Sequence, residues 1–100
     1  MLIVLGTARL GEDALKEGRA AFEAMIAASR AEEGCIDYAC SLDLLDPTML
    51  RIMEKWAREE APIAHLRTPH MAAFQHALSE LEVAITQIAR HAADDGAPLM

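Results

Sequence analysis

A single carboxylate interrupts the apolar face of a strand-like segment near the middle of the chain. Residues 48–57 alternate in polarity, so Glu54 shares a face with Leu50, Ile52 and Trp56. A carboxylate on a buried face must be paired, hydrogen-bonded or protonated, because burying it without a partner is costly. Glu54 is therefore a candidate acid–base residue. The competing interpretation is a structural anchor for a backbone N–H or a nearby histidine.

Two aromatic side chains are expected beside this carboxylate. Residues 35–44 also alternate, and an Asp-Pro turn signal separates them from the second strand, which predicts a hairpin. Matching the apolar faces requires an odd-length connection. Five residues place Tyr38 opposite Trp56, and three place Tyr38 opposite Glu54. In either register the three side chains cluster, so Tyr38 and Trp56 either hold a flat aromatic ligand or simply fill the core.

Two histidines flank a break between helical segments. His65 lies near the end of the first, residues 59–66, and His70 lies in the first turn of the second, which begins at Thr68-Pro69. The helix dipole disfavours added positive charge at that turn, so a neutral imidazole there is a candidate general base. A local hydrogen bond to a helix end is the alternative explanation for each histidine.

Other site chemistries find little support in the residue spacing. His65, His70 and His76 do not combine with Glu54 in any of the usual zinc spacings, so we expect no metal. The chain also lacks a glycine-rich phosphate loop and a dinucleotide fingerprint. We therefore expect no bound cofactor.

Composition narrows the class of partner. The 100 residues carry 9 Lys and Arg against 16 Asp and Glu, a net charge of −7, which argues against nucleic acid and anionic membranes. The apolar runs are too short for a signal peptide or a membrane helix. Cys35 and Cys40 lie five positions apart on one strand, ~17 Å apart by the rise per residue, beyond disulfide reach. Reduced thiols indicate a cytoplasmic protein.

The predicted elements define the fold class. Strands are expected at 2–9, 35–44 and 48–57, and helices at 11–33, 59–66 and 68–81. Residues 82–91 fit either a continued helix or a strand with Val83, Ile85, Gln87 and Ala89 on one face.

The resulting order is that of the ferredoxin-like α+β fold with a four-stranded antiparallel sheet. One domain over 1–92 and a tail over 93–100 are expected. The first strand is apolar on both faces, which predicts a central position, and Gly6 within it predicts close packing. Helices on one face leave the other bare, which predicts a homodimer.

Three motifs resemble those of a known family. Residues 33–38 resemble its E-G-C-x-x-Y entry to the second strand, and residues 54–56 resemble its E-x-W. Residues 65–71, with Phe74, resemble its H-L-x-T-P-H-M-x-x-F. The chain is thus similar to the antibiotic biosynthesis monooxygenase family, above all to its small quinol-monooxygenase-like members.

The resemblance implies a dimeric α+β barrel and a strand over 82–91. It implies oxygenation of a small phenolic or quinol substrate with O₂ and without metal, flavin or haem, at a site between sheet and helices. His65 would be the base, with Glu54 orienting it or a nearby histidine. His70 would exchange a second proton. Trp56 and Tyr38 would hold the ring.

Other activities within the family lead to alternatives. Haem-degrading members use an Asn, Trp and His set, whereas this chain has no Asn and carries His65 where their Trp is expected. One alternative function is a non-catalytic small-molecule-binding or stress-response dimer. Another is an isomerase acting on a small polyhydroxy ketone, which would need the same acid–base pair but no oxygen.

Overall fold

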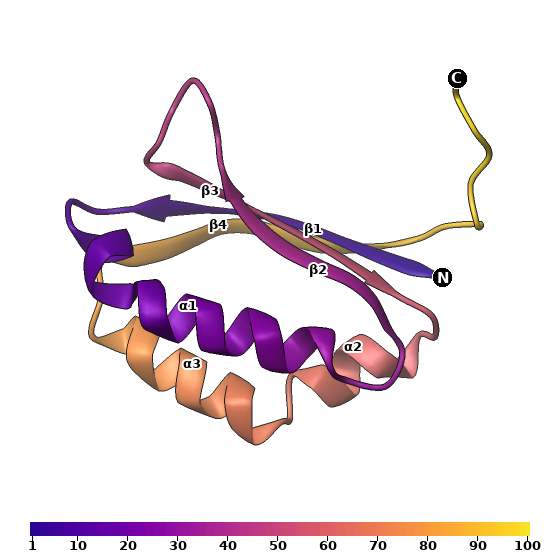
Figure 1. Cartoon of the computed structure of the whole chain (residues 1–100), viewed down its shortest axis with the longest axis horizontal. Coiled ribbons are helices and arrows are strands. Elements are labelled where there is room, and N and C mark those ends of the chain that lie inside the picture. The colour runs from indigo at the N-terminus through magenta and orange to yellow at the C-terminus, as the bar shows by residue number, and fades with distance from the viewer.

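Four antiparallel strands pair in the order β2-β3-β1-β4, with three helices on one face of the sheet (Figure 1). This computed structural model describes residues 1–100. In chain order the elements are β1 Leu2–Leu10, α1 Ala14–Arg30, β2 Cys35–Leu42, β3 Met49–Trp56, α2 Glu60–His65, α3 Pro69–Ser79 and β4 Val83–Ala92. The predicted ferredoxin-like α+β fold is confirmed, and residues 82–91 lie almost entirely in a strand rather than a helix.

Strand β1 is central, as its two apolar faces predict. Val4 and Ala8 are buried beneath the helices, whereas Leu5 points to the other face and stays 48% exposed. A Cβ atom on Gly6 would lie 2.9 Å from the carbonyl oxygen of Gln87. The close packing expected at Gly6 is therefore confirmed, and the neighbour is β4.

The β2–β3 hairpin adopts the second of the two predicted registers. Tyr38 lies opposite Glu54, and Leu42 lies opposite Leu50. The ladder ends earlier than expected, so residues 43–48 form the connection. Asp46 shapes this loop by accepting hydrogen bonds from the backbone N–H of Thr48, at 3.1 Å, and from the Thr48 hydroxyl, at 2.6 Å.

A bulge divides β4, so the prediction that Val83, Ile85, Gln87 and Ala89 share one face is wrong. Ala8 pairs with Ile85 but Thr7 pairs with Gln87, so Thr86 is an extra residue between them. The inserted residue reverses the alternation. Gln87 and Ala89 therefore join the face opposite the helices, and Ile88 and Arg90 turn toward the helices.

The helix boundaries follow local capping chemistry. Helix α1 starts at Ala14 rather than residue 11, because Asp13 takes a left-handed conformation with φ 65°. The Thr68 hydroxyl accepts a hydrogen bond from the backbone N–H of Met71 at 3.3 Å, and Pro69 occupies the first helical position, as predicted. Helices α1 and α3 meet edge to face through Phe22 and Phe74, with ring centroids 5.0 Å apart.

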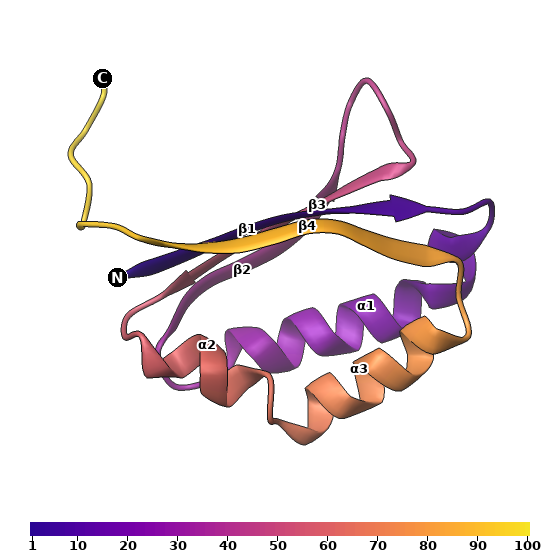
Figure 2. The same ribbon diagram turned by 180° about the vertical axis from the view of Figure 1, so that it is seen from behind.

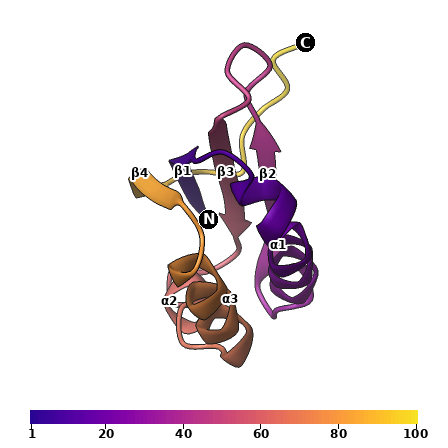
Figure 3. The same ribbon diagram turned by 90° about the vertical axis from the view of Figure 1, so that its left-hand side faces the viewer.

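The helices form a single layer (Figure 3). Helix α1 lies below the β2 side of the sheet, and α2 and α3 lie below the β4 side. The opposite face of the sheet carries no element, and the β2–β3 connection and the C-terminal segment project on that side (Figures 1 and 2). Leu44, in that connection, is fully exposed. None of the helices has the length and apolar character needed to cross a membrane.

Candidate active site

A cavity of about 410 Å³ lies between the sheet and helices α2 and α3. Its sixteen lining residues come from all four strands and from the segment spanning α2 and α3, and eleven of the sixteen are hydrophobic. The side chains on the wall that carry a polar group are Tyr38, Glu54, His65, Gln75 and Arg90. An apolar cavity with a few convergent polar groups is typical of a small-molecule site. Three of the predicted site residues, Tyr38, Glu54 and His65, lie on its wall.

Glu54 is a buried carboxylate held by an indole. Its side chain is on the helix face of β3 with 5% exposure, and its Oε1 accepts a hydrogen bond of 2.9 Å from Nε1 of Trp56. Burial raises the pKa of Glu54. The bond from Trp56 opposes that rise, and so does the positive charge of His65 whenever that imidazole is protonated. The carboxyl group is thus poised to hold a proton at a higher pH than a free glutamate would.

Tyr38 stands beside Glu54 on the neighbouring strand. Burial raises the pKa of its phenol, and the charge of Glu54 raises it further. Its ring centroid lies 5.4 Å from that of His65 and 6.4 Å from that of Trp56. The predicted clustering of Tyr38, Glu54 and Trp56 is therefore confirmed, and the phenol stays a neutral hydrogen-bond donor at ordinary pH.

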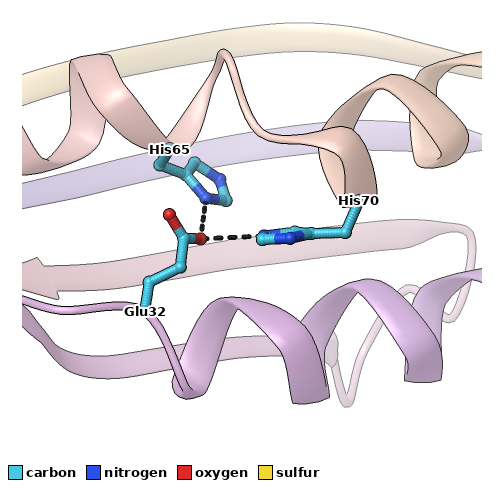
Figure 4. Close-up of side chains that lie close together, drawn as sticks. All are labelled: Glu32, His65 and His70. Carbon is cyan, nitrogen blue, oxygen red and sulfur yellow. Dashed lines mark hydrogen bonds and ion pairs between the residues drawn. The ribbon is translucent and has the colours of Figure 1, made fainter.

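A carboxylate from another part of the chain joins the two histidines (Figure 4). Oε2 of Glu32 lies 2.5 Å from Nδ1 of His65 and 2.9 Å from Nε2 of His70. Glu32 lies between α1 and β2, His65 ends α2, and His70 is in the first turn of α3. Side-chain exposure rises from 3% at His65 through 14% at Glu32 to 24% at His70. The three groups thus connect the buried site with the solvent side.

The second nitrogen of His65 is free to act on a ligand. Every fully buried side-chain nitrogen and oxygen in the molecule has a hydrogen-bond partner. Nε2 of His65 has none, so it is not fully buried, and His65 lines the cavity. Because an ionised Glu32 can only accept, it favours the tautomer with the proton on Nδ1. Nε2 then carries a free lone pair, which a general base requires.

The partner of His65 differs from the one expected from the sequence. Glu54 was the expected orienting carboxylate, but it bonds to Trp56, and Glu32 bonds to both histidines. Sequence reasoning missed Glu32 because 33 residues separate it from His65. One local signal existed: Glu32 and Glu33 follow the end of a helix, where the dipole disfavours negative charge.

Trp56 also lies differently from its expected position as a stacking surface. Its side chain is completely buried and does not line the cavity. The ring lies behind His65, with centroids 5.1 Å apart. Position 56 is the last residue of β3, and His65 at the end of the following helix, α2, lies beside the indole. Trp56 therefore contacts Glu54 and His65 from behind and does not meet a ligand in this cavity.

The Glu32, His65 and His70 cluster also has the donor types of a metal site. The three candidate ligand atoms lie within 4.8 Å of one another, and two imidazoles with a carboxylate suit zinc or iron. Hydrogen bonds within the cluster already satisfy these atoms without an ion. The expected absence of a metal remains a prediction.

The fold and cavity define a small ferredoxin-like α+β domain whose cavity is lined by a buried carboxyl group and a buried imidazole. Residues 1–77 match the family model of antibiotic biosynthesis monooxygenases, and the chain belongs to that family. No curated protein matches the chain significantly. The family resemblance inferred from the three motifs is therefore confirmed.

Solved structures agree with this placement. A candidate antibiotic biosynthesis monooxygenase from Deinococcus radiodurans is 29% identical, covers 100% of this chain and 99% of its own, and superposes with a TM-score of 0.90. Rv0793 from Mycobacterium tuberculosis is 26% identical, with coverages of 97% and 98% and a TM-score of 0.80. A Bacteroides thetaiotaomicron protein of unknown function, suggested to be an oxidoreductase, is 27% identical, with coverages of 90% and 95% and a TM-score of 0.75. These similarities support a general monooxygenase-like function.

Proposed function

We propose that the protein is a cofactor-independent monooxygenase that oxidises a small phenolic or quinol-type aromatic with O₂. The observation that carries this proposal is His65, whose Nδ1 is held by Glu32 while its ring lines an apolar cavity. An apolar site favours loss of an electron from a phenolate to O₂, because a poorly solvated anion is a stronger reductant. The family match supports the oxygenation class.

The proposed reaction balances without a further reductant. A hydroquinone and O₂ give a hydroxyquinone and water. His65 removes the first phenolic proton, and the phenolate passes one electron to O₂. The two radicals recombine as a C–O bond at a ring carbon. The O–O bond then breaks, the distal oxygen leaves as water, and the ring carbon becomes a carbonyl after loss of its hydrogen.

The remaining site residues take supporting roles in this scheme. Glu54, whose pKa is raised by burial, donates a proton to the departing oxygen. Tyr38 lines the cavity and holds the ring. His70 shares the Glu32 carboxylate with His65 and is the more exposed imidazole, so it carries the second proton to solvent.

We also propose a homodimer formed through the open sheet face, in the cytoplasm. Leu5 lies on that face, and the fully exposed Leu44 is carried on the loop that projects from the same side of the sheet. If the open sheet face of a second copy packed against this one, both open faces would be buried, and the two sheets would form the dimeric α+β barrel. Nothing in this arrangement requires a nucleic-acid or membrane partner.

A non-catalytic small-molecule-binding dimer is the second candidate. One observation favours it: all fully buried polar side-chain atoms are already hydrogen-bonded, as a purely structural network would be. Oxygen chemistry distinguishes the two candidates.

The deciding experiment follows O₂ consumption with a series of hydroquinones and ¹⁸O₂ labelling of the product. The monooxygenase incorporates one labelled oxygen into the quinone and releases the other in water. A binding protein gives no protein-dependent uptake. An isomerase of a polyhydroxy ketone turns over equally well under argon.

A further inference from the structure

Arg90 is the one cationic side chain other than histidine on the cavity wall. The bulge at Thr86 turns it to the helix face of β4, where it lies opposite Val4. Without that inserted residue the alternation would place position 90 on the open face of the sheet. The irregularity of β4 thus brings Arg90 to the wall of an apolar cavity.

Arg90 and the buried carboxylate lie on one rung of the sheet. Val4 pairs with Glu54 on one side and with Arg90 on the other, so the three residues run across β3, β1 and β4 on the same face. Two strand spacings separate the backbones of Glu54 and Arg90 by about 10 Å. A ligand in the cavity can therefore reach Glu54 with one end and Arg90 with the other.

The guanidinium has no protein partner. Arg90 makes no ion pair or side-chain hydrogen bond, although the chain carries a net charge of −7. Glu59 and Glu60 border the neighbouring depression that Arg90 also lines, but Glu60 pairs with Arg58 instead. Arg90 is exposed, so an anion bound to it keeps part of its hydration, and the desolvation free energy of that anion is small.

We propose that Arg90 is an anion subsite of this cavity and that the substrate is a hydroxyaromatic carboxylate. The planar guanidinium fork matches a carboxylate through two parallel hydrogen bonds. The ring would lie over Val4, with its hydroxyl toward His65 and Glu54 and its carboxylate on Arg90. This inference rests on the proposed function for the hydroxyl end, and it adds the class of substituent at the other end.

The test is a binding measurement that needs no oxygen chemistry. Isothermal titration calorimetry compares the affinities of 6-hydroxy-2-naphthoate and its neutral amide. The two compounds have the same shape, and each carries a hydroxyl group at one end and the carboxylate or amide group at the other. We expect the wild-type protein to bind the carboxylate about tenfold or more tightly than the amide, as a charge-assisted pair predicts. Arg90→Gln should abolish that preference and leave the amide affinity unchanged, and Arg90→Lys should keep part of it.

Lys16→Gln is the matched control, because it removes the same charge from an exposed, unpaired position on α1. Lys16→Gln should keep the full preference for the carboxylate over the amide. The control thus separates a contact with Arg90 from the effect of removing any one positive charge. A preference that survives in Arg90→Gln, or wild-type protein that binds neither naphthalene, overturns the subsite. Selective binding of the carboxylate without any O₂ uptake supports the Arg90 subsite and refutes the monooxygenase. Equal turnover of neutral and anionic quinols supports the monooxygenase and refutes the subsite.

Discussion

Nδ1 of His65 lies 2.5 Å from Oε2 of Glu32, although 33 residues separate the two in the chain. This contact ties the end of α2 to the segment after α1 and fixes the orientation of a nearly buried imidazole. Because the same oxygen also contacts His70, one carboxylate organises both histidines. Two of the predictions below follow from this relationship.

His65→Ala should abolish quinol-dependent O₂ uptake and leave the fold intact. Loss of a general base typically lowers the rate ~10²–10⁴-fold, which here brings it close to background. Melting temperature and O₂ uptake are measured on the same preparation. His76→Ala is the control, because that side chain is 81% exposed and lies outside the cavity. A variant that melts far lower but keeps wild-type activity per folded molecule would show that His65 is only structural.

Glu32→Gln should lower kcat about tenfold or more and change KM little, because Glu32 holds the base without lining the substrate cavity. The double variant with His65→Ala should be no slower than His65→Ala alone, since Glu32 acts through that imidazole. Glu33→Gln is the neighbouring control, as that carboxylate is exposed and contacts Arg58. Additive losses in the double variant would contradict the positioning role.

Glu54→Gln should stabilise the protein increasingly as pH rises. Burial raises the folded-state pKa of Glu54 above its ordinary value of 4.5, so the folded protein binds this proton more tightly than the unfolded chain. The wild type is therefore favoured below pH 4.5 and loses stability as pH rises through the folded-state pKa. The variant lacks this dependence and keeps an acceptor for the Trp56 indole.

Melting temperatures of wild type and Glu54→Gln from pH 4 to pH 8 test this expectation. The difference in melting temperature, variant minus wild type, should grow from pH 4 upward and level off once the pH has passed the folded-state pKa of Glu54. A difference that shrinks with rising pH would mean that the ionised carboxylate stabilises the fold, contrary to the sign derived from its burial.

Leu5→Asp should convert a homodimer into a monomer, because it places a charge in the middle of the open sheet face. Light scattering at micromolar concentration should give twice 10.9 kDa for the wild type and 10.9 kDa for the variant. Ala24→Asp, on the exposed side of α1, should remain dimeric. A wild-type mass of one chain at that concentration would refute the proposed dimer.

The local pattern of residues determined most of the secondary structure. Alternation in residues 35–57 placed Tyr38, Glu54 and Trp56 on one face, and the Thr68-Pro69 signal placed the start of α3 within one residue. These features depend on neighbours a few positions apart, so the sequence alone carries them. The motifs around Glu54 and His65 also led to the correct family.

Only the tertiary structure decided the partners and the depth of the site residues. Glu32 reaches His65 because the segment after α1 lies beside the end of α2 and the start of α3, and no periodicity encodes that meeting (Figure 4). Trp56 is completely buried, with His65 at the end of α2 beside its ring. Arg90 faces the cavity because one extra residue in β4 moves the side chains that follow it to the opposite faces of the sheet. The alternation of polar and apolar residues in β4 does not show where that extra residue lies. Contacts between distant segments depend on packing the whole chain, which residue spacing does not record.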